Sequence, residues 1–335
     1  MKNNILSIFL LLLIFVSCTE KNEVGIFCDR HKIITEVNEC DTIGSGEILI
    51  PQDTSILVND MYVLGNYVVF RTRQANKVIT VYNTDGKYLG AFGSIGNARN
   101  EFTGGFMANQ QYADGKFWGF DSNVMSMQSF DIEESLKMKV PVASNRIAIG
   151  KGTVNAFYIN DTTIVYDDDT PDNMCLKIVN PVTKKARKSV DLYEPHKSAI
   201  SIYCSRAVIN EQSGRLVMAM MFVNQVNFMS LDGEDRTSVS LYENATVDDS
   251  PTTLYYRGVA SVGKYVCALY TNQKLADMAN VPQTTEVHVF DWDGNFHKKL
   301  VIKDALSIIA FDKDGNMYGL DKDGNVRKYN DVGLN

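Results

Sequence analysis

The chain has 335 residues, 45% of them hydrophobic and 22% charged, and a formal net charge of −7. This composition is typical of a folded globular protein and excludes a disordered or membrane-embedded chain. The excess of acidic side chains argues against nucleic acid as a partner, because phosphate binding needs a basic surface.

The first eighteen residues have the pattern of an export signal. Lys2 precedes an apolar run from Ile5 to Val16 that is broken only by Ser7. This run is too short to span a bilayer but has the length of the apolar part of a signal peptide. Ser17 directly before Cys18 resembles the lipobox of bacterial lipoproteins, which implies that Cys18 is acylated and becomes the new N-terminus. An ordinary secretory signal that ends near a cysteine is the alternative.

These residues define the expected organisation. We predict a lipoprotein signal peptide over residues 1–17, a lipidated tether over 18–30 and a single folded domain over 31–335. No later apolar stretch approaches the length of a membrane-spanning helix, so the lipid on Cys18 is the expected membrane attachment. The expected location is the cell envelope, as an outer-membrane lipoprotein that faces the periplasm or the exterior.

The remaining cysteines suggest structure rather than chemistry. In an oxidising compartment Cys28 and Cys40 could form a disulfide, although their spacing does not prove it. Cys175 and Cys267 lie in apolar runs and are expected to be buried thiols. Since no Cys or His spacing suits zinc, we expect no metal and no cofactor.

Beyond the signal, the chain repeats a unit of four short strands and shows almost no helical periodicity. In residues 61–93 the strands are separated by turns at Gly65-Asn66 and Thr84-Asp85-Gly86, which are strong hairpin signals. Similar units cover residues 106–142, 155–192, 207–241 and 259–302. Their second turns recur at intervals of 46 to 61 residues, near Asp85, Asp131, Asn180, Asp232 and Asp293. This period fits one four-stranded propeller blade per unit.

The hydrophobic pattern supports a propeller over two tandem sandwiches. The second strand of a unit is nearly all apolar, as in residues 67–70 and 265–270, whereas the fourth strand is mixed. A last unit over residues 306–329 has only three strands. We expect the N-terminal segment to supply the missing strand, from Glu47 to Ile50 or from Ile33 to Val37, because an open edge would invite aggregation. The predicted fold is an all-β, six-bladed propeller.

A glycine-rich connection carries a family resemblance. Gly90-Ala-Phe-Gly93, Gly96 and Asn100-Glu101-Phe102 resemble the G-x-G-P-G-E-F connection of TolB-like and NHL-type six-bladed propellers, with Asn97-Ala98-Arg99 in place of further Gly and Pro. The resemblance implies the fold and the class of envelope lipoproteins. It implies no reaction, because this family has no common one.

Motifs with possible chemistry are few. The repeats that begin at Asp291, Asp312 and Asp321 place Gly too early for a calcium-binding loop and are interpreted as hairpin turns. Asp167-Asp168-Asp169 with Asp172 is a weak candidate ion site in an expected loop. The histidines do not converge on a central channel, and no nucleophile elbow is present, so no catalytic residue is predicted.

The long loops favour a binding function on one face. Blade-to-blade and second-to-third-strand connections hold the long segments, and function concentrates on such loops. At the start of three blades lie the candidate ligand-binding residues Arg146, Tyr203, Arg206, Tyr255, Tyr256 and Arg257. Arg and Tyr there suit a carboxylate or a sugar, or they tie neighbouring blades together.

Two functions remain open from the sequence. The first is a membrane-anchored, non-catalytic binding or scaffold lipoprotein whose partner is a glycan, an anionic small molecule or an envelope protein. The alternative is a propeller hydrolase or lyase that acts on a glycan or lactone in the channel.

Overall fold

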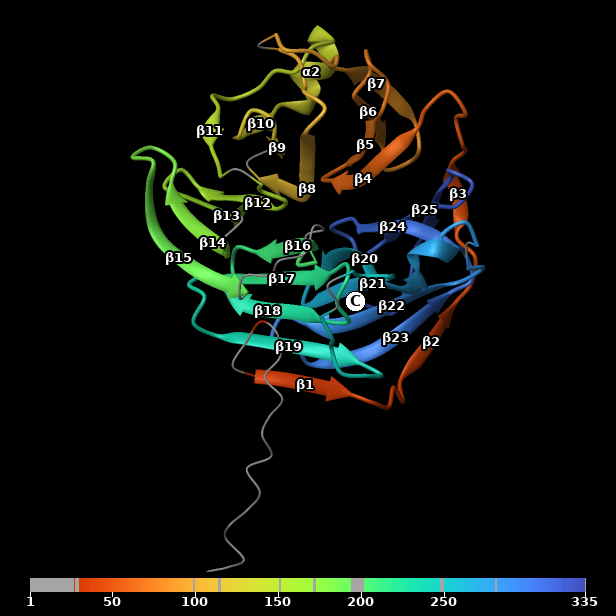
Figure 1. Ribbon diagram of the computed structural model, residues 1–335. Helices are drawn as coiled ribbons and strands as arrows, with labels where there is room; N and C mark the ends of the chain where they lie inside the picture. The colour runs from red at the N-terminus through yellow and green to blue at the C-terminus, as the bar shows by residue number, and fades with distance from the viewer. Residues whose placement is uncertain are drawn as a thin grey trace, which may run out of the picture.

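The structure is a computed structural model in which β-strands dominate (Figure 1). It describes Phe27 and residues 30–98, 100–113, 116–150, 152–170, 173–193, 202–247, 250–280 and 282–334. Within these ranges six sheets form a ring as the six blades of a propeller, which confirms the predicted fold. Cys18 and Cys28 lie outside the described residues, so the predicted signal peptide, lipid anchor and disulfide are not observed in it.

Blades 1, 2 and 3 each have four strands that follow the chain from the centre outward. Blade 1 consists of β4 (Val58–Leu64), β5 (Tyr67–Thr72), β6 (Ile79–Asn83) and β7 (Tyr88–Phe92). Blade 2 consists of β8 (Phe106–Ala113), β9 (Lys116–Asp121), β10 (Ser126–Phe130) and β11 (Ile147–Ala148). Blade 3 consists of β12 (Ala156–Asn160), β13 (Thr163–Thr170), β14 (Asn173–Asn180) and β15 (Lys185–Tyr193).

Blades 4, 5 and 6 begin in the same way. Blade 4 contains β16 (Ser205–Asn210), β17 (Arg215–Met220), β18 (Val226–Ser230) and β19 (Arg236–Leu241). Blade 5 contains β20 (Thr253–Val262), β21 (Tyr265–Lys274), β22 (Thr285–Asp291) and β23 (Phe296–Ile302), with the short 3-10 helix η1 (Leu275–Asp277) after β21. Blade 6 contains β24 (Leu306–Phe311), β25 (Met317–Asp321) and β26 (Val326–Tyr329).

The N-terminal segment runs along the outside of these last three blades (Figure 1). β1 (Arg30–Ile34) pairs in parallel with β19, and β2 (Cys40–Ile43) pairs in parallel with β23. β3 (Glu47–Ile50) pairs antiparallel with β26 and completes blade 6. The prediction that Glu47–Ile50 closes the ring is therefore confirmed, whereas the alternative with Ile33–Val37 is wrong, because the chain near Ile33 adds a fifth strand to blade 4.

The ring has two distinct faces, which we call the short-turn face and the long-loop face. The short-turn face carries the first-to-second and third-to-fourth strand turns of each blade, and the two kinds of turn meet where Thr84 N donates to Asn66 O at 3.1 Å. In the second of these turns Gly86 has a φ of +83°, which favours glycine. The long-loop face carries the connections between blades.

Two elements differ from the sequence prediction. Blade 2 contains a short helix, α2 (Ile132–Met138), where a hairpin turn near Asp131 was expected, and Asp131 caps it by accepting a hydrogen bond from Glu134 N at 2.9 Å. In blade 3, β13 and β14 continue to Thr170 and from Asn173, so the segment from Asp167 to Asn173 is mostly strand rather than a long loop.

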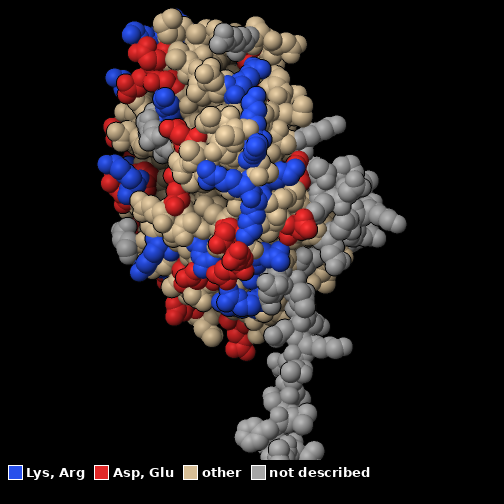
Figure 2. Space-filling view, turned by 90° about the vertical axis from the view of Figure 1, so that its left-hand side faces the viewer, with Lys and Arg blue, Asp and Glu red and all other residues tan. Residues whose placement is uncertain are grey.

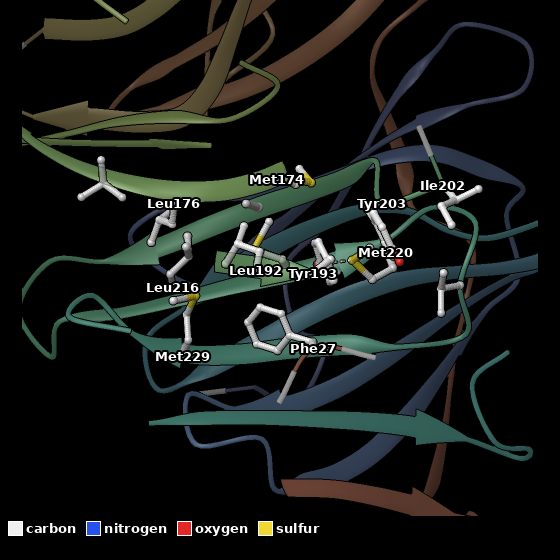
Figure 3. Packing of buried hydrophobic residues seen from close by; sticks show 14 of the residues in the cluster. Phe27, Met174, Leu176, Leu192, Tyr193, Ile202, Tyr203, Leu216, Met220 and Met229 are labelled. Carbon is white, nitrogen blue, oxygen red and sulfur yellow. Dashed lines mark hydrogen bonds between the residues drawn. The ribbon is translucent and has the colours of Figure 1, made fainter. Parts of the chain in front are cut away.

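The core consists of apolar clusters between neighbouring blades. Figure 3 shows the cluster between blades 3 and 4, where Phe27 lies among Tyr193, Tyr203 and Met220. Phe27 is only 2% exposed, and its ring centroid lies 5.6 Å from that of Tyr193. The chain is thus packed against the propeller already at Phe27, within the segment expected to be a tether.

Candidate functional site

The central channel opens on the long-loop face and holds a cavity of about 410 Å³. The inner strands of the blades surround it, and each blade contributes a polar residue near the start of its inner strand. These residues are Asn59 and Asp60 of β4, Asn109 of β8, Asn155 before β12, Arg206 of β16, Arg257 of β20 and Ser307 of β24. The apolar part of the wall includes Met61, Val259 and Leu320.

Arg206 and Arg257 are the cations that line this cavity. Both side chains are exposed, and within the described part of the chain neither makes a hydrogen bond or an ion pair. Burial lowers the pKa of Arg257 from its ordinary value, yet a guanidinium remains protonated at neutral pH. The described contacts therefore lend no support to the alternative in which these two arginines tie blades together through backbone carbonyls.

A third cation beside the channel is neutralised. Arg71 of β5 donates from Nε to Asp60 Oδ2 at 2.7 Å, and both side chains are partly buried. The Arg71–Asp60 pair leaves the carboxylate of Asp60 compensated. Among the described residues that line the cavity, the uncompensated charge is therefore positive, in a chain whose net charge is −7.

Two further cavities adjoin the channel on the same face. One of about 360 Å³ lies over blades 6 and 1, and one of about 330 Å³ lies over blades 5 and 6. Arg257 lines both of them as well as the channel. This guanidinium therefore stands where the three cavities meet.

The tyrosines predicted beside these arginines have other positions. Tyr203 is buried and stacks on Tyr193 with centroids 4.2 Å apart, and Tyr256 is fully buried with its hydroxyl 3.1 Å from His288 Nδ1. Tyr255 is half-buried against the apolar cluster between blades 4 and 5. None of the three lines the channel cavity.

Arg146 is also separate from the other two arginines. It is exposed beside β11, the outer strand of blade 2, and lines a small cleft with Asn100 and Pro141. The structure thus brings together Arg206 and Arg257 of the predicted set and places Arg146 on the outside of the ring.

The two acidic candidates whose side chains are described, Asp167 and Asp168, both have partners within the protein. Asp167 is 1% exposed and accepts hydrogen bonds from Val154 N at 2.6 Å and Asn155 N at 2.8 Å. Asp168 is buried and forms an ion pair with Lys177. The side chain of Asp169 and all of Asp172 lie outside the described residues. In the part of the chain that is described, no three His, Cys, Asp or Glu side chains gather to hold a metal ion.

The aspartate-glycine repeats are hairpin turns, as interpreted from the sequence. Asp291 Oδ1 accepts from Asp293 N at 2.9 Å and from Asn295 N at 2.8 Å, and Asp312 and Asp321 accept equivalent bonds in their own turns. The carboxylates thereby hold the turns together.

A buried polar cluster between blades 4 and 5 has no counterpart among the predicted sites. His288 is fully buried and places Nε2 2.8 Å from Glu286 Oε1, and Tyr242 donates its hydroxyl to the same oxygen at 2.6 Å. Burial lowers the pKa of His288, so the ring is neutral, with Nε2 donating to Glu286 and Nδ1 accepting from Tyr256. Although burial opposes it, the hydrogen bonds from His288 and Tyr242 lower the pKa of Glu286 to about 2.

The cluster has a weak signal in the sequence. Glu286 and His288 are two residues apart on β22, so they share one face of the strand. The chain does not reveal that Tyr242 and Tyr256 come from elsewhere to meet them. His288 lies on the third strand of its blade and does not line the channel cavity, in agreement with the expectation that the histidines do not converge there.

Comparison with known proteins identifies the fold. No family model matches the chain, and no curated protein matches it in sequence. A solved structure of a member of the DUF4221 family from Bacteroides vulgatus is 11% identical with a TM-score of 0.60, over 83% of this chain and 94% of that one. A protein from Bacteroides fragilis that is named as exported is 10% identical with a TM-score of 0.53, over 84% of this chain and 88% of its own.

Identities this low concern the fold alone. No helix in the described ranges is both long and apolar enough to cross a bilayer. The chain is a six-bladed, all-β propeller with bacterial structural neighbours, one of which is named as exported.

Proposed function

We propose that this protein is a lipid-anchored, non-catalytic binding protein of the bacterial cell envelope that holds an anionic ligand in its central channel. The observation that carries the proposal is that two guanidinium groups, those of Arg206 and Arg257, line one cavity and have no bonding partner among the described residues. The export signal with Ser17-Cys18 and the resemblance to TolB-like and NHL-type propeller lipoproteins support the envelope location, as does the exported structural neighbour.

The charge of the channel supports an anion as the ligand. A folded protein with more acidic than basic residues gains nothing from two uncompensated cations in a concave site unless something binds them. The planar fork of arginine matches a carboxylate through two parallel hydrogen bonds. A volume of about 410 Å³ is that of a small-molecule site, and Asn59, Asn109 and Ser307 offer further hydrogen bonds.

These features favour a carboxylate carried by a small molecule or an acidic sugar. An acidic side chain of an envelope protein would present the same group to the long-loop face. The two adjoining cavities leave room for a ligand that extends from the channel past Arg257.

Calorimetric titration with succinate, oligogalacturonate and a glutamate-rich peptide tests the ligand. We expect one of these probes to bind, and Arg206→Lys or Arg257→Lys to weaken binding about ten-fold because lysine lacks the fork. Arg146→Lys is the matched control, since this exposed arginine lies outside the channel. Absence of binding by all probes, or equal affinities in all variants, would contradict the proposal. Cleavage of the oligogalacturonate would support the hydrolase or lyase hypothesis instead.

A separate experiment tests the anchor. Cys18→Ser should abolish labelling by a fatty-acid probe, and it should release the protein from membranes at physiological salt or leave it unprocessed, because two acyl chains supply the stable attachment. Equal labelling of the wild-type and Cys18→Ser proteins would show that Cys18 is not the anchor, whatever the channel binds.

A further inference from the structure

A run of cations occupies the exposed outer edge of blade 3. Lys184 ends the turn between β14 and β15, and Lys185, Arg187 and Lys188 follow on β15. Lys184, Lys185 and Arg187 are exposed, and Lys188 is half-buried. Figure 2 shows Lys and Arg side chains in a band on the side of the ring where blade 3 lies. We call these four residues the basic ridge.

Three of the four charges are uncompensated. Lys188 forms an ion pair with Glu234 at 3.0 Å. Lys184, Lys185 and Arg187 have no carboxylate partner among the described residues, and Arg187 donates only to the hydroxyl of Thr163 at 3.2 Å. The ridge is therefore a local positive surface on a protein of net charge −7.

An exposed apolar side chain stands in the same turn. Val182 is 76% exposed, more than any other large hydrophobic residue in the described ranges, and it precedes Lys184 by two residues. An exposed apolar group next to several cations suits the boundary between anionic headgroups and acyl chains.

The chain reaches the propeller next to this ridge. Phe27 is packed between blades 3 and 4, with the Arg236 guanidinium 5.8 Å from its ring centroid, and Arg236 donates to Asp191 O of β15 at 2.9 Å. Arg30 then pairs with Asp235 in the turn between β18 and β19. Only eight residues separate Cys18 from Phe27, so the chain between them spans at most about 30 Å. A lipid on Cys18 would thus hold blades 3 and 4 close to the membrane.

The basic ridge and the Arg30–Asp235 pair belong to the short-turn face, whereas Phe27 itself packs against Tyr193 at the long-loop end of β15. The turn with Val182 and Lys184 joins the third and fourth strands of blade 3, and the turn with Asp235 joins the same strands of blade 4. Arg206 and Arg257 lie at the opposite, long-loop face.

We propose that the basic ridge and Val182 rest on the anionic headgroups of the membrane that Cys18 anchors, so that the channel mouth faces away from that membrane. The inference rests on the proposed lipid anchor for its orientation, but not on the identity of the channel ligand. Each cation near an anionic surface strengthens binding about five-fold. Three such cations on an acidic protein orient it, whereas attachment comes from the lipid.

Protection of a sheet edge is the other role of lysines on an outer strand. The outer strand of blade 1 shows that this propeller does not protect every outer strand with lysines. β7 exposes Tyr88 at 51% and Leu89 at 40%, and no cation lies within the strand.

Fluorescence quenching tests the orientation. The full-length lipoprotein is reconstituted in phosphatidylcholine vesicles that contain phosphatidylglycerol and brominated lipid, with tryptophan introduced as Val182→Trp or as Leu275→Trp near the long-loop face. We expect the brominated lipid to quench the fluorescence that Val182→Trp adds to that of the native Trp118 and Trp292, but not the fluorescence that Leu275→Trp adds, and we expect added salt to reduce the quenching. Equal quenching at both positions, or none at 182, would overturn the proposal.

A second measurement does not need acylation. The Cys18→Ser chain without the signal peptide, residues 18–335, should co-sediment with phosphatidylglycerol vesicles at low ionic strength, but not with phosphatidylcholine vesicles or in the presence of competing inorganic phosphate. The triple change Lys184→Gln, Lys185→Gln and Arg187→Gln should remove this binding and leave the melting temperature unchanged. Lys87→Gln, Lys303→Gln and Lys313→Gln together are the control, because these lysines are exposed on other blades. Retained binding in the ridge variant, or equal loss in the control, would contradict the proposal.

Discussion

Glu286 Oε1 lies 2.8 Å from His288 Nε2 between blades 4 and 5, and Tyr242 donates to the same carboxylate oxygen at 2.6 Å. His288 is fully buried, and the side chain of Glu286 is 27% exposed. The folded protein therefore keeps a carboxylate ionised and an imidazole neutral in a largely dry site.

The two groups make folding sensitive to acid in the same direction. The pKa of His288 is lowered by burial, so the unfolded chain takes up a proton first, and this part of the stability is lost as the pH falls below about 6.5. The pKa of Glu286 is lowered to about 2, so its part is present above about 4.5 and is lost between about 4.5 and 2. We predict that the free energy of unfolding, measured in urea, falls continuously from neutral pH towards pH 3.

Glu286→Gln should flatten the lower part of this pH profile, because an amide keeps the hydrogen-bond acceptor and removes the titration. Glu133→Gln is the control, since Glu133 accepts a similar bond from Tyr67 at 2.7 Å on the exposed surface. Profiles of the same shape in the wild-type and Glu286→Gln proteins would show that this cluster does not govern acid stability.

Ring closure by β3 can be tested at a single glycine. A Cβ atom on Gly46 would lie 2.7 Å from the ring of Tyr329, whose hydroxyl donates to Asp304 at 2.7 Å. Gly46→Ala should therefore force the strand away from β26 and lower the free energy of unfolding by about 1–3 kcal/mol. Gly44→Ala is the control, because nothing lies within 4 Å of its Cβ. If both variants melt at the wild-type temperature, β3 is not held in this register.

The blades were predictable because their signals are local. Asp-Gly and Gly-Asn turns and the apolar second strands recur within each unit, so neither required knowledge of distant contacts. The helix α2 was missed because seven residues are too few to show a helical period, although Asp131 and Glu134 have the pattern of a helix start.

The binding site was only partly predictable, because it depends on strand parity and on contacts between blades. Tyr256 and Arg257 are neighbours in sequence, so their side chains point to opposite faces of β20, and one is buried while the other lines the channel. An arginine is neutralised only when a neighbouring strand places a carboxylate beside it, as β4 places Asp60 beside Arg71 of β5. Such partners are set by the register of the sheet and not by spacing along the chain.

Phe27 tests where the folded domain begins. Its side chain is 2% exposed in the cluster between blades 3 and 4, so Phe27→Ala should lower the free energy of unfolding by about 3 kcal/mol. Ile33→Ala on β1, where the side chain is 42% exposed, should have a much smaller effect. Urea unfolding curves of the two variants distinguish a packed segment from a tether, for which both changes would be neutral.

The last prediction separates binding from stability at the channel arginines. Arg257 has no bonding partner among the described residues, so Arg257→Gln should leave the melting temperature unchanged or raise it slightly, since a charge that desolvation disfavours is removed. Arg327 is the contrast: its guanidinium donates to Asp321 at 2.8 Å and to the backbone oxygen of Gly46 at 3.0 Å. Arg327→Gln should lower the melting temperature, because it leaves partly buried acceptors without their donor. Differential scanning calorimetry of both variants measures these two melting temperatures. If Arg257→Gln unfolded at a lower temperature than Arg327→Gln, Arg257 would be a brace between blades, and the proposal that it serves a ligand would lose its main support.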